Sequence, residues 1–437
     1  MIEPVSPSPS EPDVAVFDRV ESKVRSYCRL FPRKFVRARG ARLTDDAGGS
    51  YIDFLAGCGS LNSGHNHPAI KQALLDYIAD DGVALSLDMY TAAKEAFLAE
   101  FEQTILRPRG LDYKVMCTGP TGANAIEAAI KIARRVTGRT NVVAFTNGFH
   151  GMSLGALAAT GDRTKRAGAG INLDGVTRAP YEGYFGPDVD TAALLERLLD
   201  DPSGGIDLPA AILLETVQGE GGVNAASAAW VQRIAALARK HGALLIVDDI
   251  QSGCGRTGRF FSFEELGVTP DIVTLAKSLS GLGLPFAVTL FRPEHDIWSP
   301  GQHNGTFRGN NHAFVAATAA LRHFWRSDDF AAEVQRKGAI LAARLESMAG
   351  RHAPHVKRSK GRGMMRGIEM ASGALAARVI EAAFARGLVI EGSGPSDEVI
   401  KAMAPLAISE EELNAGLDIL ESALAAVLRA NRRSAAE

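Results

Sequence analysis

The chain has 437 residues, of which 46% are hydrophobic, and its 48 lysine and arginine residues nearly balance 50 aspartate and glutamate residues, leaving a formal net charge of −2. A chain of this length buries a large core and is expected to form more than one domain. The near-neutral charge argues against nucleic acid or an anionic membrane as a partner, so small molecules are the expected partners.

The first residues predict neither a signal peptide nor a membrane anchor. The Pro- and Ser-rich stretch EPVSPSPSEPD lacks the apolar centre of a signal peptide, and no apolar run approaches the roughly 18 residues that a membrane helix needs. We therefore expect a disordered tail over residues 1–17 and a cytoplasmic protein. The cysteines, none in a CxxC pair, are expected to be free thiols: Cys28, Cys58, Cys117 and Cys254.

A small N-terminal layer follows, with a helix expected over residues 14–29 and short strands over residues 35–54. Glycines and small polar residues between positions 53 and 68 indicate backbone that passes close to a ligand. His65 and His67 alternate in this stretch, but no third ligand candidate lies nearby, so no metal site is predicted.

Alternating strands and helices between residues 112 and 291 predict a doubly wound, mostly parallel sheet. Ligands of such sheets bind at the carboxyl ends of the strands. One candidate is the Gly/Thr turn at residues 118–122, because it leads into an amphipathic helix whose N-terminus could bind a phosphate. An ordinary capped helix explains the same pattern equally well.

Polar side chains follow the other predicted strands at their carboxyl ends. Phe149 lies between glycines after the strand at residues 141–145, and Asp248 follows the apolar run at 243–247. Lys277 follows the strand at residues 271–276, where a primary amine could form a Schiff base with a carbonyl. A structural ion pair between the lysine and the aspartate is the alternative.

The segment Gly253–Gly258 matches the GxGxxG pattern of dinucleotide-binding proteins, but it opens no helix, so we reject that interpretation. Further on, helices are expected over residues 313–325 and 330–348. The last segment predicts a small α/β unit with strands at 364–370, 388–391 and 399–403, a helix at 374–386, and a final helix opened by a Ser409/Glu412 capping box.

In this order the segments resemble the class III aminotransferases, which are pyridoxal 5′-phosphate enzymes of fold type I. The motifs that carry the resemblance are GHNHP at Gly64–Pro68, FHG at Phe149–Gly151, ETVQGEGG at Glu215–Gly222 and DDIQSGCGRTG at Asp248–Gly258. The resemblance covers nearly the whole chain. It implies a large cofactor-binding domain over residues 69–325, and a small domain built from residues 18–68 and 326–430.

The resemblance also implies residue roles. Lys277 would bind the cofactor covalently and move the substrate proton, Asp248 would keep the pyridine nitrogen protonated, and Gln251 would contact the phenolate oxygen. Phe149 would stack on the ring. The phosphate would be bound by the backbone of Gly122 and Ala123 and by Thr306 of a neighbouring subunit, which implies a homodimer or a tetramer.

Within the family, strings such as RSYC at Arg25–Cys28 and HNGTFRGNN at His303–Asn311 resemble the diaminobutyrate–2-oxoglutarate transaminases of ectoine biosynthesis. That likeness implies transfer of the glutamate amino group to L-aspartate 4-semialdehyde. Lys401 stands where ornithine-type enzymes carry an arginine for the glutamate carboxylate, and Glu220 would pair with it. Cys58 is the third residue expected near the substrate.

Three alternatives stay open. Another ω-aminotransferase could use a GABA-like, ornithine-like or secondary-metabolic amine. A racemase or aminomutase on the same fold would not need 2-oxoglutarate. A non-catalytic cofactor-binding protein is disfavoured because Lys277, Asp248 and Gln251 are all present.

Overall fold

The computed structural model describes residues 15–434. Two short helices come first, α1 (Ala15–Val20) and α2 (Tyr27–Leu30), so the single helix expected over residues 14–29 is interrupted. The tail expected over residues 1–17 falls mainly on residues 1–14, outside the described residues, and positions 15–17 belong to α1.

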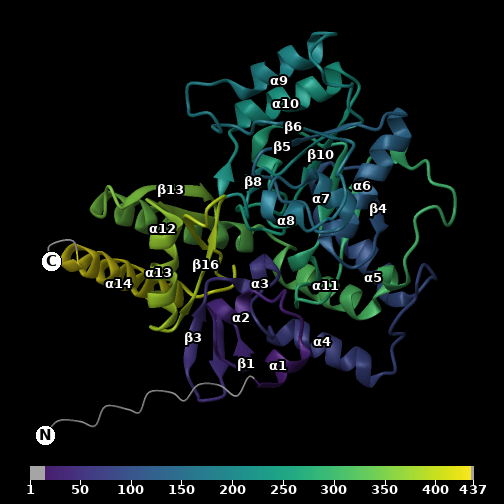
Figure 1. The fold of residues 1–437 in the computed structure, drawn as a ribbon. Coiled ribbons are helices and arrows are strands. Elements are labelled where there is room, and N and C mark those ends of the chain that lie inside the picture. The colour runs from purple at the N-terminus through teal and green to yellow at the C-terminus, as the bar shows by residue number, and fades with distance from the viewer. Residues whose placement is uncertain (1–14, 435–437) are drawn as a thin grey trace, which may run out of the picture.

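A seven-stranded mixed sheet forms the centre of the larger part of the molecule, as the alternating pattern predicted (Figure 1). Its strand order is β4-β12-β11-β10-β7-β5-β6. Strand β12 runs antiparallel to both of its neighbours, and the other strands run parallel to one another. The strands are β4 (Lys114–Cys117), β5 (Val142–Phe145), β6 (Val176–Ala179), β7 (Ala211–Leu214), β10 (Leu244–Asp248), β11 (Ile272–Leu275) and β12 (Val288–Phe291).

Helices cover both faces of this sheet, which is why its strands are apolar on both sides. On one face, α6 and α7 pack against alternate strand residues such as Ala144 and Ile246, and on the other face α5, α9, α10 and α11 pack against residues such as Phe145 and Val247. The helices of this part are α4 (Pro68–Ala79), α5 (Ala92–Phe101), α6 (Gly122–Thr137), α7 (Leu154–Ala159), α8 (Arg163–Ala167), α9 (Thr191–Asp200), α10 (Ala228–Lys240) and α11 (Asn311–Phe324).

The smaller part joins both ends of the chain. The N-terminal sheet consists of β1 (Phe35–Arg39), β2 (Arg42–Asp45) and β3 (Ser50–Asp53). Strand β15 (Leu388–Val389) pairs in parallel with β3 and adds a fourth strand to this sheet. A second sheet has the order β13-β14-β17-β16, and one core holds N-terminal Phe54 together with C-terminal side chains. Its elements are α12 (Asp329–Arg351), β13 (Val356–Arg362), β14 (Met365–Met370), α13 (Gly373–Phe384), β16 (Glu391–Ser393), β17 (Val399–Ala402) and α14 (Glu410–Ser434).

Two details differ from the sequence-based expectations. Strand β13 was not predicted, because its sequence VKRSKGR is charged rather than apolar, and the strand expected at 388–391 is split between two sheets. The Ser409/Glu412 capping box is present: the N–H of Glu412 donates to Ser409 Oγ at 3.1 Å.

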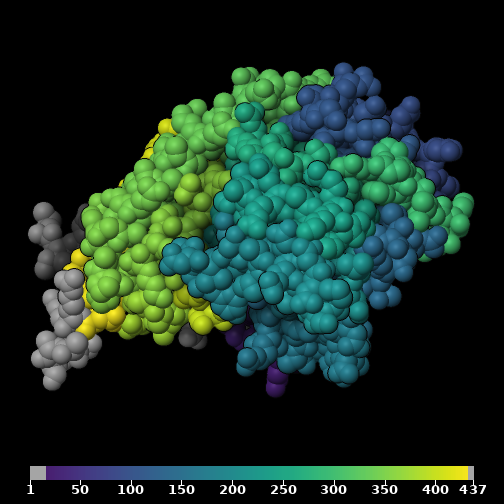
Figure 2. All heavy atoms as spheres, turned by 90° about the horizontal axis from the view of Figure 1, so that it is seen from above, coloured from purple at the N-terminus to yellow at the C-terminus, as the bar shows by residue number. Residues whose placement is uncertain are grey.

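The two parts meet along a broad front (Figure 2). Trp325 packs against the cores of both parts. The carboxyl ends of β4, β5, β7, β10 and β11 lie along one edge of the large sheet, because these strands are parallel. The polar residues that follow these strands are thereby brought together near this front. No helix in residues 15–434 combines the length and the apolar character needed to cross a membrane.

Candidate active site

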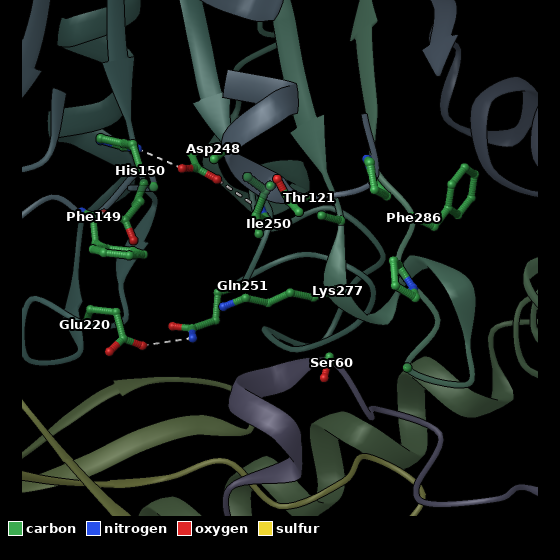
Figure 3. Close-up of a pocket in the computed structure, with 18 of the residues that line it drawn as sticks. Ser60, Thr121, Phe149, His150, Glu220, Asp248, Ile250, Gln251, Lys277 and Phe286 are labelled. Atoms are coloured by element: carbon green, nitrogen blue, oxygen red, sulfur yellow. Dashed lines mark hydrogen bonds and ion pairs between the residues drawn. The ribbon is translucent and has the colours of Figure 1, made fainter. Parts of the chain in front are cut away.

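A cavity of about 370 Å³ lies at the carboxyl edge of the large sheet (Figure 3). Residues from five separate strand ends line it, including Gly122, Phe149, Asp248 and Lys277. The strand-end residues singled out from the sequence are therefore brought together by the fold. Its size and its mixed apolar and polar walls suit a small ligand.

The N-terminus of α6 forms one wall of the cavity. Thr121 caps the helix, and its backbone and side chain exchange hydrogen bonds with those of Asn124 in a capping box. Gly122 and Ala123 belong to the first turn, where no preceding helical carbonyl accepts their N–H groups. At Gly122 a Cβ would lie 2.9 Å from Ile250 Cδ1, so a larger residue would disturb this wall. The free N–H groups and the helix dipole make this wall an anion site.

Lys277 lies two residues after the end of β11 (Ile272–Leu275), and its side chain points into the cavity (Figure 3). Its backbone has a φ of 50°, a left-handed conformation that is uncommon for a residue with a side chain and is often found at functional sites. The next residue, Ser278, fixes this turn: its hydroxyl donates to the carbonyl of Gly59 at 2.7 Å and accepts the N–H of Asn62 at 3.0 Å. The primary amine is therefore held at the cavity by a strained, anchored turn.

Asp248 ends β10 and lies opposite, with both carboxylate oxygens engaged. Oδ2 lies 2.7 Å from Nδ1 of His150, and Oδ1 accepts the N–H of Ile250 at 3.1 Å. Burial alone would lower the pKa of His150, but the hydrogen bond and the charge of Asp248 outweigh it, so the pKa is raised. A protonated His150 would form a charge-assisted hydrogen bond to Asp248 beside the cavity. The sequence contained His150 within the FHG motif, but its contact with Asp248 could not be read from the motif.

The neighbouring carboxylate, Asp249, points away from the cavity. It is fully buried, where its oxygens accept hydrogen bonds from Ser252 Oγ at 2.9 Å and from the N–H of Ser262 at 3.0 Å. Burial raises the pKa of Asp249 to about 6. The two adjacent carboxylates therefore differ in role: Asp248 faces the ligand space and Asp249 supports the loop.

Phe149 forms another wall of the cavity and is held by Glu215. The N–H of Phe149 donates to Glu215 Oε2 at 3.0 Å, and Lys165 Nζ lies 5.4 Å from the centroid of the Phe149 ring. Glu215 is buried, and burial raises the pKa of its carboxyl. The sequence singled out Phe149 but not the carboxylate that positions it.

Gln251 connects the cavity to a buried group of charged residues. Its Nε2 donates to Glu220 Oε1 and to the carbonyl of Cys58, both at 3.1 Å. Glu220 Oε1 also accepts a hydrogen bond from Lys401 Nζ at 2.7 Å, and Lys401 in turn lies 2.9 Å from Glu391 Oε1. Burial alone would raise the pKa of Glu220, but the charges of Lys401 and Lys277 outweigh it and lower the pKa. The predicted Glu220–Lys401 contact is present, and Glu391 is a partner that the sequence did not indicate.

The Lys401 side chain is fully buried on β17, whereas Glu220 is partly exposed and lines the cavity. Glu220 therefore stands between Lys401 and the ligand space. Cys58 lies beside the same group, with its thiol 2.8 Å from the Tyr27 hydroxyl.

Thr306 and the two histidines of the GHNHP motif, which the sequence analysis considered, do not line the cavity. Thr306 is exposed in the turn Thr306–Gly309 and does not line the cavity of its own chain. His65 pairs with Asp53 at 2.8 Å, and the ring of His67 lies 4.6 Å from that of His323. The histidine contacts are of the ordinary structural kind.

The residues that line the cavity fit pyridoxal 5′-phosphate. A helix N-terminus with free N–H groups suits its phosphate, the amine of Lys277 suits its aldehyde, and the carboxylate of Asp248 suits a protonated pyridine nitrogen. Phe149 offers a flat apolar face to the ring. Each reactive group of the cofactor thus has a chemically matched residue among those around the cavity.

Comparison with known proteins agrees with this fit. The family model for class III aminotransferases matches residues 25–424. The diaminobutyrate–2-oxoglutarate transaminase of Halalkalibacterium halodurans is 53% identical over 420 residues, covering 96% of this chain and 98% of that protein. The enzyme of the same name from Vibrio parahaemolyticus is 56% identical, covering 94% and 97%.

Among solved structures, the ornithine aminotransferase of Toxoplasma gondii superposes with a TM-score of 0.83 at 28% identity. The match covers 96% of this chain and 94% of that one, and the Toxoplasma gondii protein was crystallised with partial occupancy of pyridoxal 5′-phosphate at its active site.

Proposed function

The chain belongs to the class III aminotransferases, and from that membership we propose that it transfers the amino group of L-glutamate to L-aspartate 4-semialdehyde, giving 2-oxoglutarate and L-2,4-diaminobutyrate. Enzymes of this family depend on pyridoxal 5′-phosphate, and so does this one. The observation that carries the substrate assignment is the identity above one half, over nearly the full length, to relatives named for this reaction. We place the reaction in ectoine biosynthesis.

We propose these roles for the residues around the cavity. The cofactor, when bound, supplies an electron sink for the carbanion that forms when a substrate carbon loses its proton. Lys277 holds the cofactor, and its free amine then takes the proton from the substrate carbon and returns it to complete the transfer. Asp248 supplies negative charge to the pyridine nitrogen, and the contact with His150 Nδ1 at 2.7 Å orients that carboxylate.

The remaining residues around the cavity bind the cofactor and orient the substrate. Gly122 and Ala123 donate backbone N–H groups to the phosphate. Phe149 covers one face of the ring. Gln251 donates to the phenolate oxygen with one of the two N–H groups that otherwise bind Glu220 and the Cys58 carbonyl. Glu220 faces the part of the substrate that lies beyond the reacting carbon, and Lys401 lies behind Glu220, to which it is hydrogen-bonded.

We propose a homodimer as the minimum active unit, with a tetramer as an extension of it. Apolar side chains are exposed next to the turn that carries Thr306: Tyr90 is fully exposed, Met89 is 58% exposed and Phe307 is 63% exposed. The two segments are joined by a hydrogen bond from the N–H of Ser86 to the carbonyl of Gly309 at 2.9 Å. A subunit contact over this surface would bury these side chains and bring Thr306 to a neighbouring phosphate site.

We also propose that the enzyme works in the cytoplasm. All four cysteines are free thiols, as expected in a reducing compartment.

A single-turnover experiment tests the reaction. The purified holoenzyme is mixed separately with L-glutamate, L-2,4-diaminobutyrate, ornithine and GABA, and the loss of the visible absorption of the aldehyde form of the cofactor is followed. We expect rapid conversion by glutamate and diaminobutyrate and slow conversion by the other two. Rapid conversion by another amine in place of diaminobutyrate would identify a different ω-aminotransferase, and product that lacks a keto acid would identify a racemase or aminomutase.

The Lys401 role predicts a selective effect on glutamate. Because Lys401 is the cation that could receive the glutamate α-carboxylate once Glu220 moves aside, Lys401→Met should raise the KM for glutamate by roughly 10-fold or more. Lys401→Arg keeps the charge and should retain most of the affinity. Steady-state kinetics, with thermal denaturation to verify folding, decides the point. Unchanged glutamate kinetics in Lys401→Met would remove this role.

A further inference from the structure

The group around Lys401 carries a surplus of negative charge. Two carboxylates, Glu220 and Glu391, contact one ammonium group at 2.7 and 2.9 Å. The other nearby cation is Lys277, whose charge also lowers the pKa of Glu220, but the proposed function assigns its amine to the cofactor, so in the holoenzyme one ammonium group faces two carboxylates. Glu391 Oε1 also has no hydrogen bond of good geometry among the described residues, although its side chain is only 5% exposed. A buried carboxylate that is only partly satisfied indicates a binding site for a further cation.

The other oxygen of Glu391 faces two acceptor-rich groups. The Tyr27 hydroxyl donates to Glu391 Oε2 at 3.1 Å, so the Cys58 thiol is the donor in its contact with the hydroxyl oxygen, which keeps one further lone pair. The Cys58 thiol lies 2.8 Å from the same hydroxyl and 4.0 Å from Glu391 Oε2. Burial raises the pKa of both Tyr27 and Cys58, so both groups stay protonated. Oxygen and sulfur lone pairs beside a carboxylate suit an ammonium group and disfavour a carboxylate.

The loop that carries Cys58 is strained into place. The turn α3 (Ala56–Gly59) has positive φ at every residue, including 47° at Ala56 and 55° at Cys58. Left-handed conformations of this kind are costly for residues with side chains and persist only where the surroundings hold them. Here the holding contacts come from the cavity itself: Gln251 Nε2 donates to the Cys58 carbonyl, and Ser278 Oγ donates to the Gly59 carbonyl. The position of the thiol is thereby coupled to Gln251 and to the turn after Lys277.

We propose that Glu391, with the Tyr27 hydroxyl and the Cys58 thiol, forms a subsite for the ammonium group of the substrate that does not react, and that Glu391 selects diamino substrates over monoamines with the same reacting end. This inference rests on the proposed function, because L-2,4-diaminobutyrate and L-aspartate 4-semialdehyde both carry such an α-ammonium group. The surplus charge of the Glu220–Lys401–Glu391 group is then balanced when the substrate binds.

Two substrates isolate this contact. L-2,4-diaminobutyrate and GABA share the carbon chain, the carboxylate and the terminal amine, and they differ only in the α-ammonium group. In the wild-type holoenzyme, diaminobutyrate should therefore react much faster than GABA at equal concentration. In Glu391→Gln, which keeps the shape and removes the charge, the ratio of kcat/KM for diaminobutyrate to that for GABA should fall by roughly 10- to 100-fold. GABA should react no more slowly than in the wild type.

Tyr27→Phe and Glu398→Gln complete the variant set. Tyr27→Phe removes the hydroxyl of the half-exposed Tyr27 and should lower the same ratio by a smaller factor, roughly 3- to 10-fold. Glu398→Gln is the matched control, since Glu398 lies near the same strand pair but accepts only the N–H of Ser396 among the hydrogen bonds of its side chain in the described chain. That control should leave the ratio unchanged.

Equilibrium binding gives a readout that is independent of turnover. In a Lys277→Ala background, titration calorimetry of the cofactor-loaded protein should show that Glu391→Gln weakens diaminobutyrate binding by roughly 10-fold or more while GABA binding is unchanged.

The outcomes separate this inference from the proposed function. A wild-type enzyme that converts glutamate but not diaminobutyrate overturns the proposed function and the inference with it. A wild-type enzyme that prefers diaminobutyrate, combined with an unchanged ratio in Glu391→Gln, overturns the ammonium subsite alone. Equal loss of diaminobutyrate, GABA and glutamate reactions in Glu391→Gln also overturns it, since that result assigns Glu391 a purely structural role.

Discussion

Lys277→Ala abolishes amino transfer, with an expected fall in kcat of at least about 10³-fold, because the variant loses both the covalent attachment of the cofactor and the amine that moves the substrate proton. The strained turn after β11 brings this amine to the cavity, and within residues 15–434 no other lysine lines it. Steady-state rates with glutamate as the donor measure the loss.

The matched control for this variant is Lys240→Ala. Lys240 is an exposed lysine paired with Asp200 at 2.7 Å on a distant helix, so its removal should leave the rate and the stability nearly unchanged. Part of the activity of Lys277→Ala should return when a small primary amine is added, since a free amine can carry the proton. A Lys277→Ala enzyme that keeps a tenth of the wild-type rate would exclude the proposed role.

Asp248→Asn has the second largest expected effect, a fall in kcat of roughly 10²- to 10⁴-fold. The substitution keeps the shape of the side chain but removes the charge that would hold a proton on the pyridine nitrogen. It also removes the charge that raises the pKa of His150. The 2.7 Å contact with His150 Nδ1 can persist in a neutral form, so the fold should be retained. Rates of the glutamate half-reaction and the visible spectrum of the bound cofactor measure both consequences.

The adjacent carboxylate provides an internal control. Asp249→Asn changes a fully buried group that contacts Ser252 and Ser262 and does not line the cavity. Because burial already raises the pKa of Asp249 to about 6, the neutral amide is well matched to this site. We expect a rate close to that of the wild type. Comparable rate losses in the Asp248 and Asp249 variants would show that charge at the sheet edge in general, rather than Asp248 in particular, supports the reaction.

Much of the large sheet could be predicted from local patterns. Apolar runs of four to five residues followed at once by polar groups identified the strand ends at Asp248 and Lys277, since a strand buried on both faces has a distinctive composition. The charged strand β13 lacks that composition, because all but one of its seven residues are exposed or only partly buried and they form no apolar pattern. The antiparallel direction of β12 also has no local signal.

The candidate site was likewise predicted only in part: the sequence indicated the residues that line the cavity but not the residues that support them. Lys277, Asp248, Phe149, Gly122 and Gln251 were identified from motifs, and the cavity contains all of them. Their supporting partners were not identified. His150 and Glu215 act on Asp248 and Phe149 through contacts that join residues 98 and 66 positions apart.

The sequence by itself determined the alternation of strands and helices, the strand-end residues and the motifs, because periodicity and short spacings are local properties of a chain. Only the tertiary structure decided which charges meet. Tyr27 and Glu391, 364 positions apart, come within 3.1 Å because β15 adds the C-terminal segment to the N-terminal sheet. Glu391 lies beside Lys401 for a different reason: β16 pairs antiparallel with β17, which places Glu391 directly opposite Lys401, and no local pattern encodes that pairing.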